Sequence, residues 1–302
     1  MNPIIPRRLI EHLEWKPGQE IPQLPVANPS RQAQGNIFSI DNLIQSGRPF
    51  YSEEKDSSNN WIGAAVSLKQ AAAHADTDGI VASLPYLLAG KAKADKSNYL
   101  WKTWLTALSE EDVGISEGRI PGIAEAGEPV LAVVHGGGVL RTYDRIMKAY
   151  ADGLTPQSAA KFTGEEFNNV VGGKFEENIP VYTVDNLKKG ISPFGRYAVL
   201  VNFEIAKATK SGYHSKSEFM NNEVVIARAG TLEYLDKYFE KAKGTSGDAK
   251  DKVGSWHRFT KIDPQQPQGR LLFLNNNYNG LNGTDYLDNS GRFVGVAPEA
   301  HP

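Results

Sequence analysis

The sequence predicts an α+β protein, with a helix-rich N-terminal half and a mixed, partly antiparallel sheet in the C-terminal half. Apolar residues recur at helical spacing between residues 61 and 108, and short apolar runs typical of strands are spread through the second half. Strands and helices do not alternate as they do around a parallel sheet. With 302 residues, of which 40% are hydrophobic and 23% charged, the chain is long and apolar enough to bury a sizeable core.

Three helices are predicted in the first half. The first begins near Trp61 and ends where residues 76–79 interrupt the pattern. The second begins at Ser83, because the proline at position 85 is tolerated in a first helical turn. The third covers Lys96–Leu108, whose aromatic and leucine side chains recur at helical spacing and are expected in the core.

The second half opens with a strand that is expected to be buried on both faces, because Pro129–Val134 is a continuous apolar run. Helices are predicted over Thr142–Ala151 and Thr231–Lys243. Thr155, followed by proline, and Thr163, which begins a capping box, mark two further helix starts. The remaining strands are predicted at Val181–Val184, Tyr197–Phe203, Val224–Ala227, Trp256–Phe259, Arg270–Leu274 and Arg292–Val296.

Residues 1–36 differ from the rest of the chain. Four prolines fall between Lys16 and Pro29 with apolar residues between them, so this segment is expected to be an extended apolar arm. The arm either lies over the chain's own core or docks on a neighbouring subunit. Residues 37–302 are expected to form a single α+β domain, and a soft division near residue 120 stays open.

Composition and charge exclude several functions. The chain has no cysteine, which excludes disulfide scaffolds, thiolate nucleophiles and cysteine-based metal sites. A formal net charge of −2 disfavours nucleic acid as a partner. No segment resembles an export signal or a membrane span, so we expect a soluble protein that is cytoplasmic or part of an intracellularly assembled particle, without a membrane partner. No cofactor is indicated.

The strongest chemical signal is the loop of His135, Gly136, Gly137 and Gly138, between the predicted strand and the following helix. Glycines there let backbone N–H groups approach an anion closely, and the start of a helix favours negative charge. The string resembles the oxyanion-hole loop of the lipase and esterase α/β-hydrolases over about ten residues. That family's G-x-S-x-G nucleophile motif does not occur in the chain, so the resemblance does not extend to its activity.

Two arginines are candidates to clamp an anion beside this loop. Arg196 and Arg228 each lie within or beside a predicted strand, and a guanidinium binds carboxylate or phosphate with two parallel hydrogen bonds. The candidate site therefore comprises His135 as an acid or base, the three glycines as an anion holder, and these two arginines. An ordinary glycine turn and a solvated strand face are the alternatives.

No metal site is predicted. The six histidines are not spaced to share one helical face. Asn275–Tyr286 begins like a calcium loop, but a tyrosine stands at the twelfth position, where a glutamate is needed. Its two Asn-Gly pairs favour tight turns instead.

Two functions stay open. The first is a structural or assembly subunit, or an interaction protein, that self-associates as a homo-oligomer through residues 1–36. The second is an enzyme that acts on a small anionic or acyl substrate held by the loop from His135 to Gly138.

Overall fold

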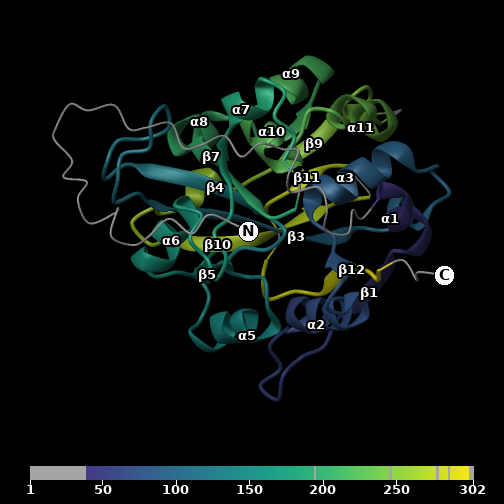
Figure 1. The fold of residues 1–302 in the computed structure, drawn as a ribbon, viewed down its shortest axis with the longest axis horizontal. Helices are drawn as coiled ribbons and strands as arrows, with labels where there is room; N and C mark the ends of the chain where they lie inside the picture. The colour runs from purple at the N-terminus through teal and green to yellow at the C-terminus, as the bar shows by residue number, and fades with distance from the viewer. Residues whose placement is uncertain (1–38, 194, 245–246, 277–278, 285, 299–302) are drawn as a thin grey trace, which may run out of the picture. The chain divides into compact units, whose positions relative to one another are not determined.

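The computed structural model describes residues 39–193, 195–244, 247–276, 279–284 and 286–298. The chain divides into two compact units, Met1–Ile37 and Phe38–Pro302. The predicted N-terminal arm lies outside the described residues, all of which belong to the second unit (Figure 1).

A mixed sheet forms the centre of this unit. In its middle strands, β7, β4, β3 and β10, each strand runs antiparallel to its neighbours. By contrast, β6 lies parallel to β7 and β11 lies parallel to β9. The α+β class is therefore confirmed. In spatial order the strands are β6 (Val181–Thr183), β7 (Tyr197–Asn202), β4 (Pro129–His135), β3 (Leu105–Ile115), β10 (Gln268–Leu274), β11 (Leu281–Asn282), β9 (Val253–Trp256) and β8 (Gly212–His214), with β5 (Ala160–Lys161) paired to β10.

A second, three-stranded antiparallel sheet joins the two ends of the described chain. Its central strand β12 (Gly291–Val296) pairs with β1 (Arg48–Ser52) on one side and with β2 (Ile80–Val81) on the other. This pairing on both sides confirms the strand predicted at Arg292–Val296.

Helices cover both faces of the central sheet (Figure 1). Several begin at a side chain that the sequence singles out: Thr142 caps α5, and Thr163 forms a complete capping box with Glu166 at α6. The helices are α1 (Ile40–Ser46), α2 (Gly63–Ala75), α3 (Leu84–Lys93), α4 (Tyr99–Lys102), α5 (Tyr143–Ala151), α6 (Gly164–Val171), α7 (Val184–Lys188), α8 (Phe203–Ala208), α9 (Lys216–Asn221), α10 (Glu223–Ala229) and α11 (Leu235–Ala242), with 3-10 turns at Gly247–Ala249 and Phe259–Lys261.

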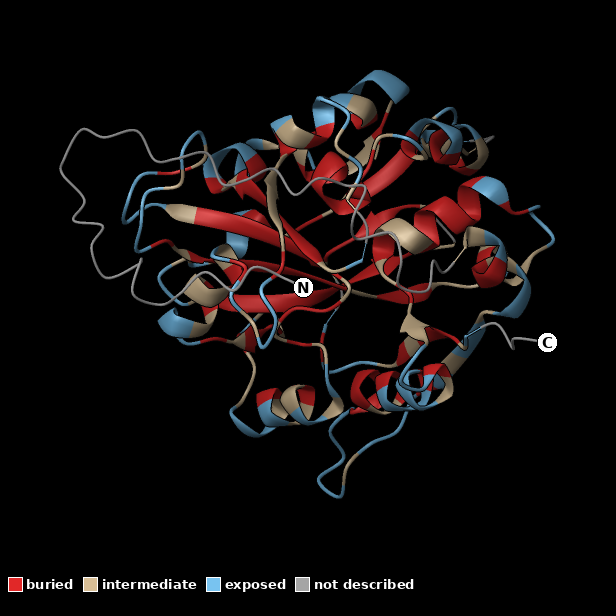
Figure 2. Cartoon of the chain, viewed as in Figure 1, coloured by how far each residue is buried: buried red, intermediate tan, exposed pale blue. Residues whose placement is uncertain are grey.

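Strand β4 shows how the core is built. Leu131 and Val133 face the cluster that contains residues of α3, α10 and α11, whereas Val130, Ala132 and Val134 face the cluster that contains residues of α6. Side chains alternate across a strand, so a strand covered on both faces is apolar throughout. Figure 2 shows this burial along the central strands, with exposed residues on the outer sides of the helices.

Three predicted elements are wrong. Within Lys96–Leu108 only Tyr99–Lys102 is helical, and the chain then enters β3 at Leu105. Val224–Ala227 belongs to helix α10, because Asn222 caps its N-terminus and Gly230 ends it in the left-handed conformation. Thr155 accepts the N–H of Ala159 within a turn and starts no helix.

Two further predictions differ from the structure. Helix α11 begins at Leu235 and not at Thr231. The strand predicted at Trp256–Phe259 is also wrong, because β9 ends at Trp256 and Phe259 begins a 3-10 turn.

Candidate functional site

The glycine turn after β4 is tightly held by the chain itself. Gly136 and Gly137 adopt φ angles of +74° and +95°, which favour glycine over any other residue. Their N–H groups both donate to the carbonyl oxygen of Leu108, at 2.9 and 3.1 Å. These two backbone donors are therefore used inside the protein.

Two further backbone N–H groups, just beyond Gly138, bind an acidic side chain of the chain itself. Val139 and Leu140 donate to the two carboxylate oxygens of Glu110 at 2.5 and 2.8 Å. Gly138 allows this approach, because a Cβ atom at its position would lie 2.0 Å from Oε1 of Glu110. The carboxyl group bound here comes from strand β3, and its backbone donors are Val139 and Leu140 rather than the predicted Gly136 and Gly137.

His135 is a buried structural residue. Its side chain is fully buried, and its ring nitrogens lie 2.9 Å from the hydroxyl of Ser109 and 2.9 Å from the carbonyl oxygen of Ala227. Burial lowers the pKa of His135 to about 4, so the imidazole is neutral at physiological pH. The geometry offers His135 no contact with a substrate.

Beside the glycine turn lies a pocket of about 240 Å³, which we call the arginine pocket. Three arginines from separate segments face it: one follows the glycine turn, one is in the first turn of α5, and one precedes β7. The pocket is lined by Gly138, Val139, Arg141, Thr142, Arg145, Phe175, Glu176 and Arg196. Two predicted site residues, Gly138 and Arg196, therefore lie at one site.

Arg196 is fixed in place but not fully paired. Its Nε atom donates to the carbonyl oxygen of Gly137 at 2.5 Å, and its guanidinium lies 4.4 Å from the ring centroid of Phe175. Its Nη2 atom is buried and has no hydrogen-bond partner among the residues that the structure describes. Burial, and then the positive charge of Arg141, lower the pKa of Arg196 below its ordinary value. An arginine stays protonated all the same, so an anion placed here would relieve an unfavourable charge.

Arg145 shows the same pattern on the helix. Its Nε and Nη2 atoms donate to Oε1 of Glu166 at 3.2 and 3.0 Å, and its guanidinium lies 5.4 Å from the ring of Phe162. Its Nη1 atom is buried, and no residue in the described part of the chain forms a hydrogen bond with it. Two guanidinium groups that line one pocket thus each retain an unpaired buried nitrogen, which is uncommon for charged groups in folded proteins.

The third arginine already has a partner. Arg141 forms an ion pair with Glu176, which is itself part of the pocket lining. The hydroxyl of Thr142 accepts the N–H of Arg145 as the cap of α5. The lining therefore offers cationic hydrogen-bond donors, and it suits the binding of an oxyanion more than covalent chemistry.

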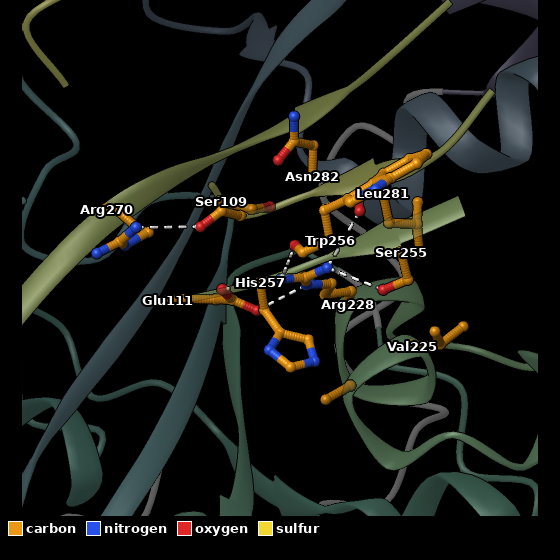
Figure 3. Close-up of polar contacts among 12 residues, drawn as sticks. Ser109, Glu111, Val225, Arg228, Ser255, Trp256, His257, Arg270, Leu281 and Asn282 are labelled. Atoms are coloured by element: carbon orange, nitrogen blue, oxygen red, sulfur yellow. Dashed lines mark hydrogen bonds and ion pairs between the residues drawn. The ribbon is translucent and has the colours of Figure 1, made fainter. Parts of the chain in front are cut away.

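Arg228, the other predicted clamp, lies elsewhere. It is fully buried on α10 and donates to both carboxylate oxygens of Glu111, at 2.6 and 3.0 Å (Figure 3). Its Nη1 atom also donates to the hydroxyl of Ser255 at 3.0 Å and to the carbonyl oxygen of Leu281 at 3.1 Å, and Nη2 donates to the carbonyl oxygen of Trp256 at 3.0 Å. With all these contacts satisfied, Arg228 belongs to the core.

Most of the pocket was not predicted from sequence. Arg141 and Arg145 stand four residues apart across a helix start, a spacing that places them near the positive end of α5. This spacing at a helix start is the sequence pattern that could have indicated Arg141 and Arg145. Phe175 and Glu176 come from the loop between α6 and β6, and no local pattern connects them with arginines.

Two other features, a metal-binding cluster and a membrane-spanning helix, are absent from the described residues. No group of three or more histidine, aspartate or glutamate side chains among them is arranged to hold a metal ion. None of the helices in the described part of the chain has the length and apolar character that crossing a membrane requires.

Comparison with known proteins shows the fold. No protein-family model and no curated protein matches the chain. A solved chain, described as "Accommodation of massive sequence variation in Nanoarchaeota by the C-type lectin fold", matches with a TM-score of 0.58 and 21% sequence identity. The match covers 83% of this chain and 98% of that chain. The described unit is thus similar to a C-type lectin fold, and at this identity the similarity concerns architecture alone.

Proposed function

We propose that this chain is a binding protein whose arginine pocket takes an oxyanion, either free or as the phosphate, sulfate or carboxylate group of a larger ligand. The observation that carries the proposal is the pair of arginines, Arg145 and Arg196, that line one pocket and that each retain a buried guanidinium nitrogen without a partner among the described residues. A buried charged donor without a partner is costly, and an incoming oxyanion would satisfy both.

The size of the pocket agrees with such a ligand. A volume of about 240 Å³ equals roughly eight water molecules. That space accommodates a small oxyanion and part of the group that carries it.

The fold alone does not identify the ligand. The Nanoarchaeota chain is described as accommodating massive sequence variation by the C-type lectin fold. For this chain we take the same fold to be a scaffold on which side chains, and with them the ligand, can differ. The ligand class is therefore argued from the pocket.

Binding is favoured over catalysis by the position of His135. The imidazole is buried and paired with Ser109 and Ala227, so it supports the enzyme hypothesis poorly. The arginine pocket needs no nucleophile in order to bind an anion.

The test is titration calorimetry of the full chain with inorganic phosphate and with sulfate at low ionic strength. Arg196→Gln removes one charge from the pocket, and we expect it to weaken binding by about tenfold or more, since a hydrogen bond to a charged group contributes about 1.5–3 kcal/mol. Arg119→Gln is the matched control, because Arg119 is 68% exposed and pairs with Glu125 outside the pocket. Absence of binding by the wild-type chain, or equal affinities for the two variants, would refute the proposal.

Self-association through residues 1–36 is a separate proposal that rests on the proline-rich sequence of that segment. Light scattering of the full chain and of a chain that lacks these residues tests it. We expect a homo-oligomer for the full chain and a smaller particle for the shortened one, and a monomeric full chain would overturn the proposal.

A further inference from the structure

The loop between α6 and β6 brings an acidic side chain to the arginine pocket. Glu176 lines the pocket and forms an ion pair with Arg141. Glu177, the next residue, contributes a negative charge that acts on Arg196. The pocket that we propose for an anion therefore already contains one carboxylate of the chain.

The loop is fixed at its ends and at one anchor. Lys174 donates its N–H to the carbonyl oxygen of Asn169 at 2.7 Å, and Ile179 donates to that of Gly173 at 2.9 Å. Between these ties, Phe175 packs against the core cluster of α6 and lies under Arg196. The backbone therefore keeps Glu176 beside the pocket whether or not its carboxylate is bound.

The carboxylate of Glu176 is held much less firmly than the loop. Its side chain is 78% exposed, against 31% for its partner Arg141. An ion pair with so exposed a partner contributes little to stability, because the charges stay hydrated and screened. By contrast, Glu166 pairs with Arg145 through two hydrogen bonds and also accepts the N–H of Thr163 in the capping box of α6, so its carboxylate is held on two sides.

We propose that Glu176 is an intramolecular competitor at the arginine pocket, and that an oxyanion binds by displacing its carboxylate from Arg141. This inference rests on the proposed function and describes its regulation. Because Arg141 is occupied in the unbound protein, the affinity for an external anion is lower than the three arginines alone would give. Displacement leaves Glu176 in water, where its high exposure makes it easy to accommodate.

The experiment compares the affinity for inorganic phosphate of the wild-type chain and of Glu176→Gln, measured by calorimetry. We expect Glu176→Gln to bind roughly two- to fivefold more tightly, the range that corresponds to the free energy of an exposed ion pair. Glu165→Gln is the matched control. It removes an exposed carboxylate from the first turn of α6, and Glu165 forms none of the ion pairs found among the described residues. Its affinity should equal that of the wild type.

A second background separates direct competition from a general change of charge. In a chain that carries Arg141→Gln, Glu176 has lost its partner, so Glu176→Gln should no longer increase the affinity. An increase that persists in this background, or an affinity of Glu176→Gln equal to or weaker than that of Glu165→Gln, would overturn the inference.

The two proposals fail in different ways. If wild-type phosphate binding depends on Arg196 while Glu176→Gln has no effect, the proposed function stands and the competitor does not. If neither the wild type nor Glu176→Gln binds, both proposals are refuted.

Discussion

Lys91 gives a prediction of stability whose size follows from its surroundings. The residue lies on α3 with its side chain fully buried, and its Nζ atom has no hydrogen-bond partner. The charge of Lys91 has a cation–π contact with the ring of Trp101, whose centroid lies 5.0 Å from Nζ. Burial lowers the pKa of Lys91 from 10.5 to about 7. The substitution Lys91→Met keeps the length of the side chain and removes the charge.

The sign of the effect follows from the protons that each state binds. Between pH 7 and pH 10.5 the unfolded chain holds a proton on Lys91 that the folded chain has released, so the stability of the wild type rises with pH over this range. One pKa unit is worth about 1.36 kcal/mol, and the full shift corresponds to about 5 kcal/mol as an upper bound. We therefore expect Lys91→Met to be more stable than the wild type by about 2–5 kcal/mol at pH 7.

Urea unfolding at pH 7 and at pH 10 measures this difference. The difference in free energy of unfolding between Lys91→Met and the wild type should shrink by several kcal/mol toward pH 10. At that pH Lys91 is neutral in the folded chain, and half or more of the free-energy cost of removing its proton has gone. Lys93→Met, on the same helix but with a side chain that is 50% exposed, is the control and should show no such trend. A variant that is no more stable than the wild type at pH 7, or an advantage that does not change with pH, would refute the reasoning.

The three consecutive acids of β3 give two further predictions. Glu111→Gln should destabilise the chain by about 3–5 kcal/mol in chemical denaturation, because it leaves the buried charge of Arg228 uncompensated. Combining Glu111→Leu with Arg228→Met should recover most of that loss, and a double variant as unstable as Glu111→Gln would contradict this. Burial, and then the charge of Glu110, raise the pKa of Asp112 well above its ordinary value, which favours the protonated form of this buried carboxyl group. Asp112→Asn should then cost less than about 1 kcal/mol at pH 7, and a loss above about 2 kcal/mol would show that Asp112 is ionised.

The same acids explain why no strand was predicted at β3. Residues 110–112 look like a solvated stretch, yet each is buried. Their compensation comes from distant residues: Glu110 is held by backbone N–H groups that follow β4, and the partner of Glu111 stands 117 positions further along the chain. A local pattern of apolar residues contains no information about such partners.

Helix α10 was misread for a related reason. Its β-branched residues favour a strand in isolation, but Val224 and Val225 are buried on a helix that Asn222 caps. By contrast, β4, α3, α5 and the capping box of α6 were predicted correctly, because their signals are local and agree with their burial.

The arginine pocket could be predicted only in part. The glycines after β4 suggested a turn that holds an external anion, whereas in the structure the residues that follow them bind Glu110. Arg196 meets Arg141 and Arg145 because β7 pairs with β4 and brings its first residues beside the glycine turn. That pairing is a property of the sheet, and the spacing of the arginines along the chain does not reveal it.

Crystals grown or soaked with selenate provide the most direct test of the arginine pocket, since selenium can be located by its anomalous scattering. We expect selenate within hydrogen-bond distance of the unpaired nitrogens of Arg145 and Arg196, with the carboxylate of Glu176 withdrawn from Arg141. An empty pocket at a selenate concentration that saturates binding in solution, or selenate bound only at other positions, would contradict the assignment of this pocket as the anion site.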